Sequence, residues 1–235
     1  MIRKLYLALT LVSTGIMAMA QGNDADAKKV LDAVSTKFKS FSSVQAKFTY
    51  QVLKANGGVL STKTGNITMK GTKYKVDFGS QQIFSDGKTV WSYDKSAKEV
   101  TINNLDPSGS TLTPQKLFTN FYDQDFLYKL NGEKKVGAKT YQEIEMTPTD
   151  KSKAFHKVYL LVDKVTKTIY STRVLEKGGN SYVYTVSSMK TNAAVADNTF
   201  IFDKSKYPGV DEVDLRILAL VEYESIISHR RIGLH

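Results

Sequence analysis

The first apolar pattern along the chain has helical spacing, and it gives way at once to strand alternation. Apolar residues recur every three or four positions between Val30 and Phe41, which predicts an amphipathic helix over 24–41. From Val44 to Val52 apolar and polar residues alternate, which predicts a strand with one buried face. The sequence therefore indicates a helix that leads directly into a sheet.

The alternation continues through most of the chain, interrupted by turn signals such as Asp86-Gly87 and Asn131-Gly132. Further strands are expected at 65–70, 73–78, 83–84, 90–93, 100–102, 140–146, 157–163, 168–175 and 181–190. No stretch between them has the composition of a linker. We therefore expect a single domain over 21–216.

One internal segment breaks the strand pattern. Residues 114–130 place leucine and aromatic side chains at roughly helical spacing, with Thr113 as a suitable N-cap and Pro114 in the first turn, which predicts a second helix. An antiparallel sheet of eight or more strands would curl strongly, and the helices would have to cover its apolar concave side. Such a fold is mainly β and encloses a groove or a cavity.

The two ends of the sequence differ from this domain. Residues 1–20 combine Arg3 and Lys4, an apolar run and a small-residue cleavage pattern that ends at Ala20, which predicts a secretory signal peptide. The apolar run is shorter than the roughly 20 residues that a membrane-spanning helix needs. We therefore expect a soluble, exported protein. The tail 217–235 fits the domain poorly, and we assign it no function.

Composition and charge exclude several classes of function. The 235 residues include no cysteine, so thiolate nucleophiles, cysteine-bound metals and cysteine lipidation are excluded. The formal charge is +10, but only five of the 33 basic residues are arginine. Lysine is poor at recognising bases, so the charge suits anionic membrane surfaces and acidic proteins better than nucleic acid. We expect no nucleic-acid partner.

The titratable residues show no catalytic or metal-binding pattern. His156 stands alone before a strand, without an HExxH motif or a spaced carboxylate set. Glu143 and Glu145 alternate on one strand, so both carboxylates share a face, and their neighbours predict that this face is solvated. We expect no enzymatic activity, no cofactor and no metal site.

The aromatic content has two interpretations. The chain holds 13 Tyr, 11 Phe and one Trp, concentrated on one face of the strands and in 114–130. These side chains could form the core of a large sheet. The pattern itself favours that interpretation, and the alternative is that they line a cavity for an apolar ligand, because a curved sheet with few helices does not fill its own concave side. The pattern alone leaves both interpretations open.

The stretch from Ile83 to Asp94, with the sequence IFSDGKTVWSYD, resembles the most recognisable segment of one known family. This family is the outer-membrane lipoprotein carriers, or LolA-like periplasmic proteins. The order of the expected elements agrees, and the resemblance covers residues 24–215. It implies an unclosed antiparallel β-barrel, or half-barrel, covered by a helical lid that encloses a hydrophobic cavity.

The resemblance also implies a function and partners. Proteins of this family hold the acyl chains of lipoproteins and move them through the periplasm from the inner to the outer membrane. An inner-membrane ABC transporter loads them, and an outer-membrane receptor or acceptor unloads them. We expect a monomer whose ligands are acylated lipoproteins or lipid. The alternative is a periplasmic lipid-sensing or regulatory binding module on the same fold.

Alternation assigns candidate lipid-binding residues on the strands and on the lid. The strand residues are Phe48, Tyr50, Tyr74, Val76, Phe78 and Trp91, and the lid residues are Phe118, Phe121 and Tyr122.

One feature of this chain departs from the family pattern, and another distinguishes the carriers from related receptors. The strand that enters the hairpin often carries an arginine that holds the lid closed, whereas this chain has Lys70 there, which lacks the planar fork of donors. Lipidated receptors with the same fold need an N-terminal cysteine. The absence of cysteine excludes that role.

Overall fold

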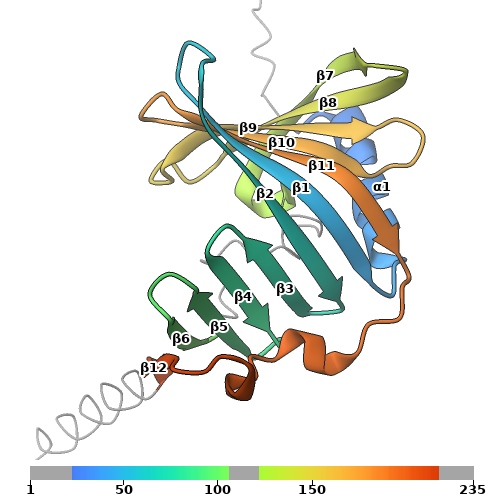
Figure 1. Cartoon of the computed structure of the whole chain (residues 1–235). Coiled ribbons are helices and arrows are strands. Elements are labelled where there is room, and N and C mark those ends of the chain that lie inside the picture. Colours follow the sequence, from blue (N-terminus) through green and yellow to red (C-terminus); the bar gives the residue numbers. More distant parts are fainter. Residues whose placement is uncertain (1–22, 106–121, 217–235) are drawn as a thin grey trace, which may run out of the picture.

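The computed structural model describes residues 23–105 and 122–216, most of which belong to one large sheet (Figure 1). The strands are β1 (Val44–Leu53), β2 (Val59–Lys70), β3 (Lys73–Phe78), β4 (Gln81–Ser85), β5 (Thr89–Asp94), β6 (Glu99–Asn104), β7 (Phe126–Val136), β8 (Lys139–Pro148), β9 (Phe155–Asp163), β10 (Ile169–Glu176), β11 (Ser181–Thr191) and β12 (Asp211–Asp214). The helices are α1 (Ala25–Lys39) and α2 (Tyr122–Asp125), with 3₁₀ helices η2 (Asp197–Phe200) and η3 (Lys204–Lys206).

The sheet is antiparallel and open. Its twelve strands follow the order β12-β6-β5-β4-β3-β2-β1-β11-β10-β9-β8-β7, so β7 and β12 form the two edges. The short strand β12 differs from the others because it runs parallel to β6. The sequence had indicated neither β12 nor the 3₁₀ helices. The expected mainly β, unclosed architecture is confirmed.

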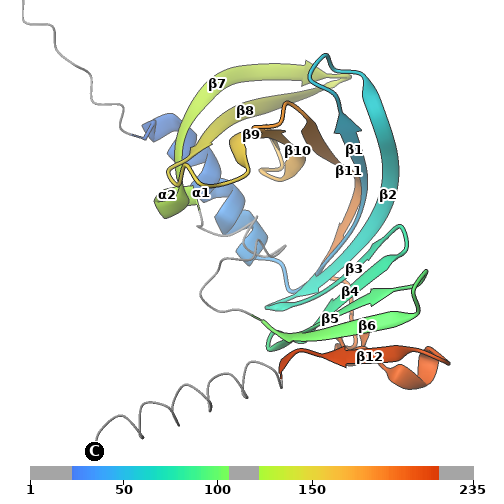
Figure 2. The same ribbon diagram turned by 90° about the vertical axis from the view of Figure 1, so that its left-hand side faces the viewer.

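Helix α1 lies on the concave side of the curled sheet, against β7, β8 and β9 (Figure 2). Its buried stripe includes Val30, Leu31 and Val34, as the apolar spacing predicted. Together with side chains from α2 and from β7 to β10, this stripe forms the largest buried cluster of the described residues. The N-terminal half of the helix therefore seals one part of the concave side.

Asp24 fixes the start of α1 to the edge of the sheet. Its carboxylate accepts hydrogen bonds from the backbone N–H groups of Asp26 (2.8 Å) and Ala27 (3.4 Å), which is a helix N-cap. The same carboxylate accepts from the N–H of Leu130 on β7 at 2.9 Å. The Asp24 N–H donates to the Tyr128 carbonyl at 3.2 Å. The helix start thus covers polar groups that an edge strand would otherwise expose.

The helix expected over 114–130 is wrong in its described part. Helix α2 covers only Tyr122–Asp125, and β7 begins at Phe126 and continues through the expected turn at Asn131-Gly132. A register shift between Leu130 and Gly132 allows β7 to continue as a bulged strand. The strand alternation was hidden by Leu127, an exposed apolar residue between buried ones. Residues 114–121 lie outside the described part of the chain.

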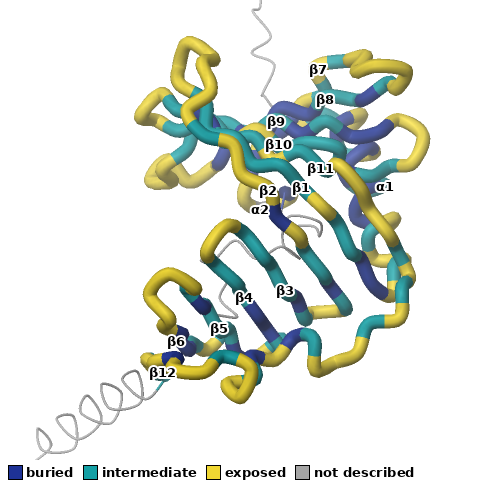
Figure 3. Tube along the Cα trace, viewed as in Figure 1, coloured by how far each residue is buried: buried dark blue, intermediate teal, exposed yellow. Residues whose placement is uncertain are grey.

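The convex face of β4 to β6 is also covered. Phe84, Tyr93 and Val100 form a buried cluster with Phe202 and Val210 from the segment that follows β11. Figure 3 shows buried positions on these strands, although they lie far from α1. Buried apolar side chains on the convex face therefore hold the segment that follows β11 against this part of the sheet.

The face that carries Glu145 is not simply solvated. Glu145 is only 8% exposed and accepts hydrogen bonds from Lys157 and from Asn131. The Lys157 hydrogen bond is the main cause that lowers the pKa of the Glu145 carboxyl. Ion pairing with lysines therefore explains the buried carboxylate and corrects the expectation from the sequence.

Gly65 on β2 allows an aromatic side chain to lie across the sheet. It pairs with Phe48 on β1 and Phe78 on β3, whose rings stack with centroids 5.9 Å apart. A Cβ atom at Gly65 would overlap the Phe48 ring and lie 2.8 Å from the Asp77 carbonyl oxygen. A glycine is required here because the Phe48 ring occupies the space of a side chain.

The Asp24 contacts predict a measurable contribution to stability. We expect Asp24→Ala to lower the free energy of unfolding by about 1–2 kcal/mol, because a cap and a bond to β7 are lost. Backbone hydrogen bonds lower the pKa of the Asp24 carboxyl below its ordinary value of 3.8, and the bond from Leu130 has the largest effect. The stabilisation is therefore complete above pH 3.8 and is lost as the pH falls through the lower folded-state pKa.

Urea denaturation of both proteins from neutral to acidic pH measures this difference. The control Asp26→Ala removes an exposed carboxylate that pairs only locally with Lys29, and it should cost less than about 0.5 kcal/mol. Equal losses for the two variants would contradict the assigned role of Asp24.

Substitution of Gly65 should cost stability for a different reason. We expect Gly65→Ala to lower the free energy of unfolding by about 1–3 kcal/mol, because the Phe48 ring and the backbone must both shift. Thermal melting monitored by circular dichroism measures the loss. Gly178→Ala is the matched control, since its added Cβ meets nothing within 4 Å. If the Gly65→Ala protein is as stable as the control, the close contact between Gly65 and the Phe48 ring is contradicted.

Candidate functional site

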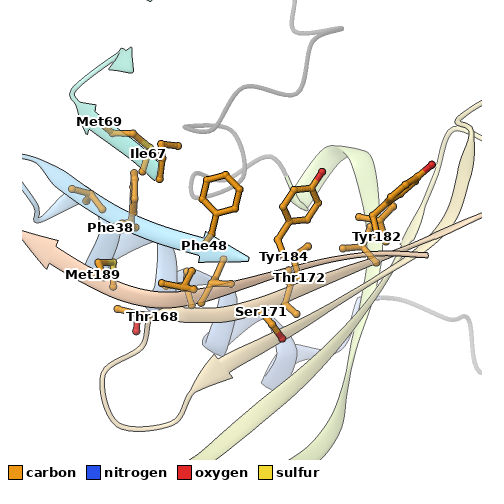
Figure 4. Close-up of a pocket in the computed structure, with 18 of the residues that line it drawn as sticks. Phe38, Phe48, Ile67, Met69, Thr168, Ser171, Thr172, Tyr182, Tyr184 and Met189 are labelled. Carbon is orange, nitrogen blue, oxygen red and sulfur yellow. The ribbon is translucent and has the colours of Figure 1, made fainter. Parts of the chain in front are cut away.

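A cavity of about 620 Å³ lies on the concave side, between the C-terminal half of α1 and the strands (Figure 4). Its lining is largely apolar and comes from elements that are far apart in the sequence. The helix contributes Phe38, and the following loop contributes Phe41. The strand residues are Val44, Ala46, Phe48, Ile67, Met69, Val76, Phe155, Val158, Leu160, Ile169, Val174, Val186 and Met189. This volume falls within the range of small-molecule sites in proteins.

The strand register brings these apolar side chains to one face. Phe48 is paired with Val186 on β11, and Ala46 with Ile67 on β2, which is paired in turn with Val76. Because directly paired residues in an antiparallel sheet point to the same side, the lining continues across neighbouring strands. The cavity therefore follows from alternation within strands and from register between them.

Aromatic rings extend the lining beyond Phe48. Tyr50 lies 5.2 Å from Phe78 and 5.0 Å from Tyr184, and it stacks on Tyr182 at 5.8 Å, all between ring centroids. Figure 4 shows Phe48, Tyr184 and Tyr182 side by side, each projecting from its strand. Tyr184 is 42% exposed. These rings offer a broad apolar surface that is only partly covered.

The rim of the cavity carries five charged residues. Lys153, Asp125 and Glu176 line it near the start of β9, and Lys37 and Lys167 line it near the end of β9. The Tyr182 hydroxyl is hydrogen bonded to Glu176, which is the main cause that raises the pKa of this phenol. The charged groups thus lie near the two ends of β9, and the rest of the lining is apolar apart from hydroxyl groups such as those of Ser171 and Thr172.

The structure places five of the predicted lipid-binding residues on the cavity side of the sheet. Phe48 and Val76 line the cavity. Tyr50 and Phe78 continue the same face through the aromatic cluster, outside the lining itself. Tyr74 is buried next to the cavity, in a cluster with Val44 and Met69.

The other predicted residues do not join them. Trp91 pairs with Phe84, which lies on the opposite face of the sheet, and it packs against the convex cluster. Tyr122 is 3% exposed in the core beneath α1, where its hydroxyl donates to Asp32 at 2.7 Å. The register and the packing of α2 thus place Trp91 and Tyr122 away from the cavity. Phe118 and Phe121 lie outside the described residues.

Several lining residues were not predicted as part of the site. Phe38 was assigned to the buried face of α1, and Tyr182, Tyr184 and Val186 were assigned only to a strand. The alternation of these three on β11 was a usable signal, because it repeats that of β1. No local pattern could show that the end of α1 reaches the same cavity.

Lys70 makes its contacts away from the cavity. Its ammonium donates to the Val195 carbonyl at 3.0 Å and to Asp197 at 2.8 Å, and Lys73 donates to the same carboxylate at 2.7 Å. Hydrogen bonds from these two lysines lower the pKa of Asp197 to about 2. Lys70 thus anchors the segment that leads into η2.

The described residues show neither a metal-binding cluster nor a membrane-spanning helix. No group of three or more acidic or histidine side chains among them is placed to hold a metal ion. Within the same ranges, no helix combines the length and the apolar character needed to span a bilayer.

Two relatives that are similar to this chain carry the same name. The outer-membrane lipoprotein carrier protein of Histophilus somni is 26% identical over 221 residues, which cover 91% of this chain and 98% of the relative. The protein of the same name from Pseudomonas putida is 27% identical over 211 residues, with 86% and 93% covered.

Structural and family comparisons agree with this similarity. An uncharacterized conserved protein from Thermus thermophilus has a similar fold, with a TM-score of 0.56 at 13% identity, covering 80% of this chain and 99% of that one. The family model described as outer membrane lipoprotein carrier protein LolA matches residues 39–203. Because this match covers well over half of the sequence, the chain belongs to the LolA family of outer membrane lipoprotein carriers.

Proposed function

We propose that the protein is a periplasmic carrier that binds the acyl chains of lipoproteins in its concave cavity and moves them from the inner to the outer membrane. The observation that carries this proposal is the apolar cavity of about 620 Å³, in a chain of the lipoprotein carrier family. The described residues that line this cavity include no convergent catalytic groups. A carrier without enzymatic activity fits this arrangement.

The size and chemistry of the lining are suited to alkyl chains. Each methylene that leaves water contributes about 0.8 kcal/mol, so ten buried methylenes contribute about 8 kcal/mol. A membrane offers the same acyl chain a comparable gain. A carrier must therefore bury enough of the cargo to compete with the bilayer, and it must still release it.

The partly exposed aromatic rings support release as well as uptake. Tyr50, Tyr182 and Tyr184 have broad apolar faces that an acyl chain can cover without entering a closed core. The proposal includes loading by an inner-membrane ABC transporter and transfer to an outer-membrane receptor or acceptor, both inferred from the family. Phe118 and Phe121 remain predicted lid residues, from the sequence alone.

The carrier proposal is tested by native mass spectrometry after incubation with a triacylated lipopeptide. We expect a one-to-one complex that survives removal of excess lipopeptide. The same peptide without acyl chains should not bind, because the contacts assigned to the site are apolar. A folded protein that forms no complex with the triacylated form would contradict the proposed function.

A charge placed in the cavity should prevent binding. Val186 lines the cavity, whereas Val183 on the same strand pairs with Arg173 and points to the convex side. We expect Val186→Glu to weaken binding of the lipopeptide more than tenfold, since a carboxylate against an acyl chain costs several kcal/mol. The matched control Val183→Glu should bind as the original protein does. Similar binding by the two variants would contradict the location of the site.

A substitution of Trp91 tests whether this residue contributes to lipid binding or only to stability. Because Trp91 packs on the convex face, we expect Trp91→Phe to leave lipopeptide affinity unchanged within about twofold, while lowering the melting temperature. Fluorescence polarisation with a labelled lipopeptide measures the affinity. A clear loss of affinity in the folded variant would show that Trp91 contributes to lipopeptide binding and would contradict this prediction.

A further inference from the structure

A second, polar groove adjoins the apolar cavity. This groove has a volume of about 600 Å³ and lies beside the turn between β9 and β10. Lys37, Phe41, Lys167 and Met189 line both spaces, so a molecule that leaves the cavity at this rim enters the groove directly. The stacked rings of Tyr141 and Tyr170, 4.5 Å apart between centroids, belong to its wall.

The groove is positively charged and rich in hydroxyl groups. Lys37, Lys139 and Lys167 line it, and Asp163 is its one carboxylate among the described lining residues. Asp163 accepts from the N–H groups of Val165 and Thr166, each at 2.9 Å, and from Lys139 at 3.3 Å. With Lys139 matched by Asp163, the positive charges of Lys37 and Lys167 remain.

The contacts of these two lysines are with neutral groups. The Lys37 ammonium lies 5.4 Å from the centroid of the Phe41 ring, and the Lys167 ammonium donates to the Gln142 side chain at 3.4 Å. The groove also carries the hydroxyl groups of Thr166, Thr168 and Ser188. Lysines and hydroxyl groups are common ligands of phosphate oxygens. The junction of the two spaces is therefore suited to a phosphate ester.

The opposite rim of the cavity has a different charge. There Lys153 is accompanied by the two carboxylates of Asp125 and Glu176. The nine residues of β9 separate the two rims by about 30 Å, at roughly 3.3 Å per residue. An elongated amphiphile with an anionic head would thus be favoured in one orientation only.

We propose that the site also accepts an anionic glycerophospholipid, with its acyl chains in the apolar cavity and its phosphate between Lys37 and Lys167. This inference rests on the proposed function, because it requires acyl chains in that cavity. It adds a specificity for the headgroup that an acyl-binding cavity alone would not have. The glycerol part of the headgroup then contacts the hydroxyl groups of the polar groove.

The test compares lipids that share two octanoyl chains and differ in the headgroup. Isothermal titration calorimetry measures the affinity for dioctanoyl phosphatidylglycerol, for the net-neutral dioctanoyl phosphatidylcholine and for dioctanoylglycerol. We expect phosphatidylglycerol to bind about tenfold more tightly than the other two, as two partly exposed ion pairs allow. This preference should decrease at high salt.

Variants locate the preference within the structure. Lys37→Gln/Lys167→Gln should lower the affinity for phosphatidylglycerol about tenfold and change that for dioctanoylglycerol much less. The single variant Lys167→Gln tests the same point if the pair unfolds. The control Lys88→Gln/Lys135→Gln removes the same charge at exposed positions outside both linings and should change neither affinity.

Each other outcome overturns the inference in a recognisable way. Equal binding of the three lipids to the original protein would remove the headgroup site and leave the acyl-binding proposal intact, whereas binding of none would remove both. An equal loss in the control pair would indicate general electrostatic attraction. If glycerophosphate alone competes as strongly as the lipid, the groove is a site for free phosphate esters.

Discussion

The structure depends on a mismatch between a long curved sheet and the one long helix that covers its concave side in the described residues. Helix α1 has 15 residues and is about 22 Å long. The central strands β1, β2 and β11 have 10 to 12 residues each and are about 33–40 Å long. Apolar side chains continue along these strands past the helix. The concave face is therefore partly core and partly cavity.

This mismatch divides the sheet into regions with different roles. Where α1 packs on β7 to β9, side chains such as Ile144 and Met146 are fully buried and supply stability. Where the helix ends, Phe38 and Phe41 contact the cavity instead. Asp24 holds the helix start against β7, and this sets how far the other end reaches. The cavity thus arises from elements that mainly stabilise the fold, and the lysines at its rim add charge beside the apolar lining.

The sequence predicted those features that depend on local periodicity. Alternation correctly placed Phe48 and Val76 on one face, because the convex neighbours of these residues are polar. It placed Trp91 on the cavity face, whereas Trp91 pairs with Phe84 on the convex face, and only the register of β4 with β5 and the position of the segment after β11 show this. It also missed β7, where Leu127 and the bulge at Leu130 obscure the period of two. Contacts with a distant segment decide the case of Trp91, and no single window of sequence contains them, whereas β7 is obscured by local interruptions of its alternation.

In the proposed function, acyl chains occupy the concave cavity when the protein carries its cargo. Site-specific photocrosslinking during export of a lipoprotein tests this occupancy, with a photoreactive phenylalanine analogue placed at single positions. We expect adducts with the acylated lipoprotein from Ile67 and Val186, which line the cavity, and none from Val183 on the convex face. Adducts from Val183 alone, or equal adducts from all three positions, would contradict it.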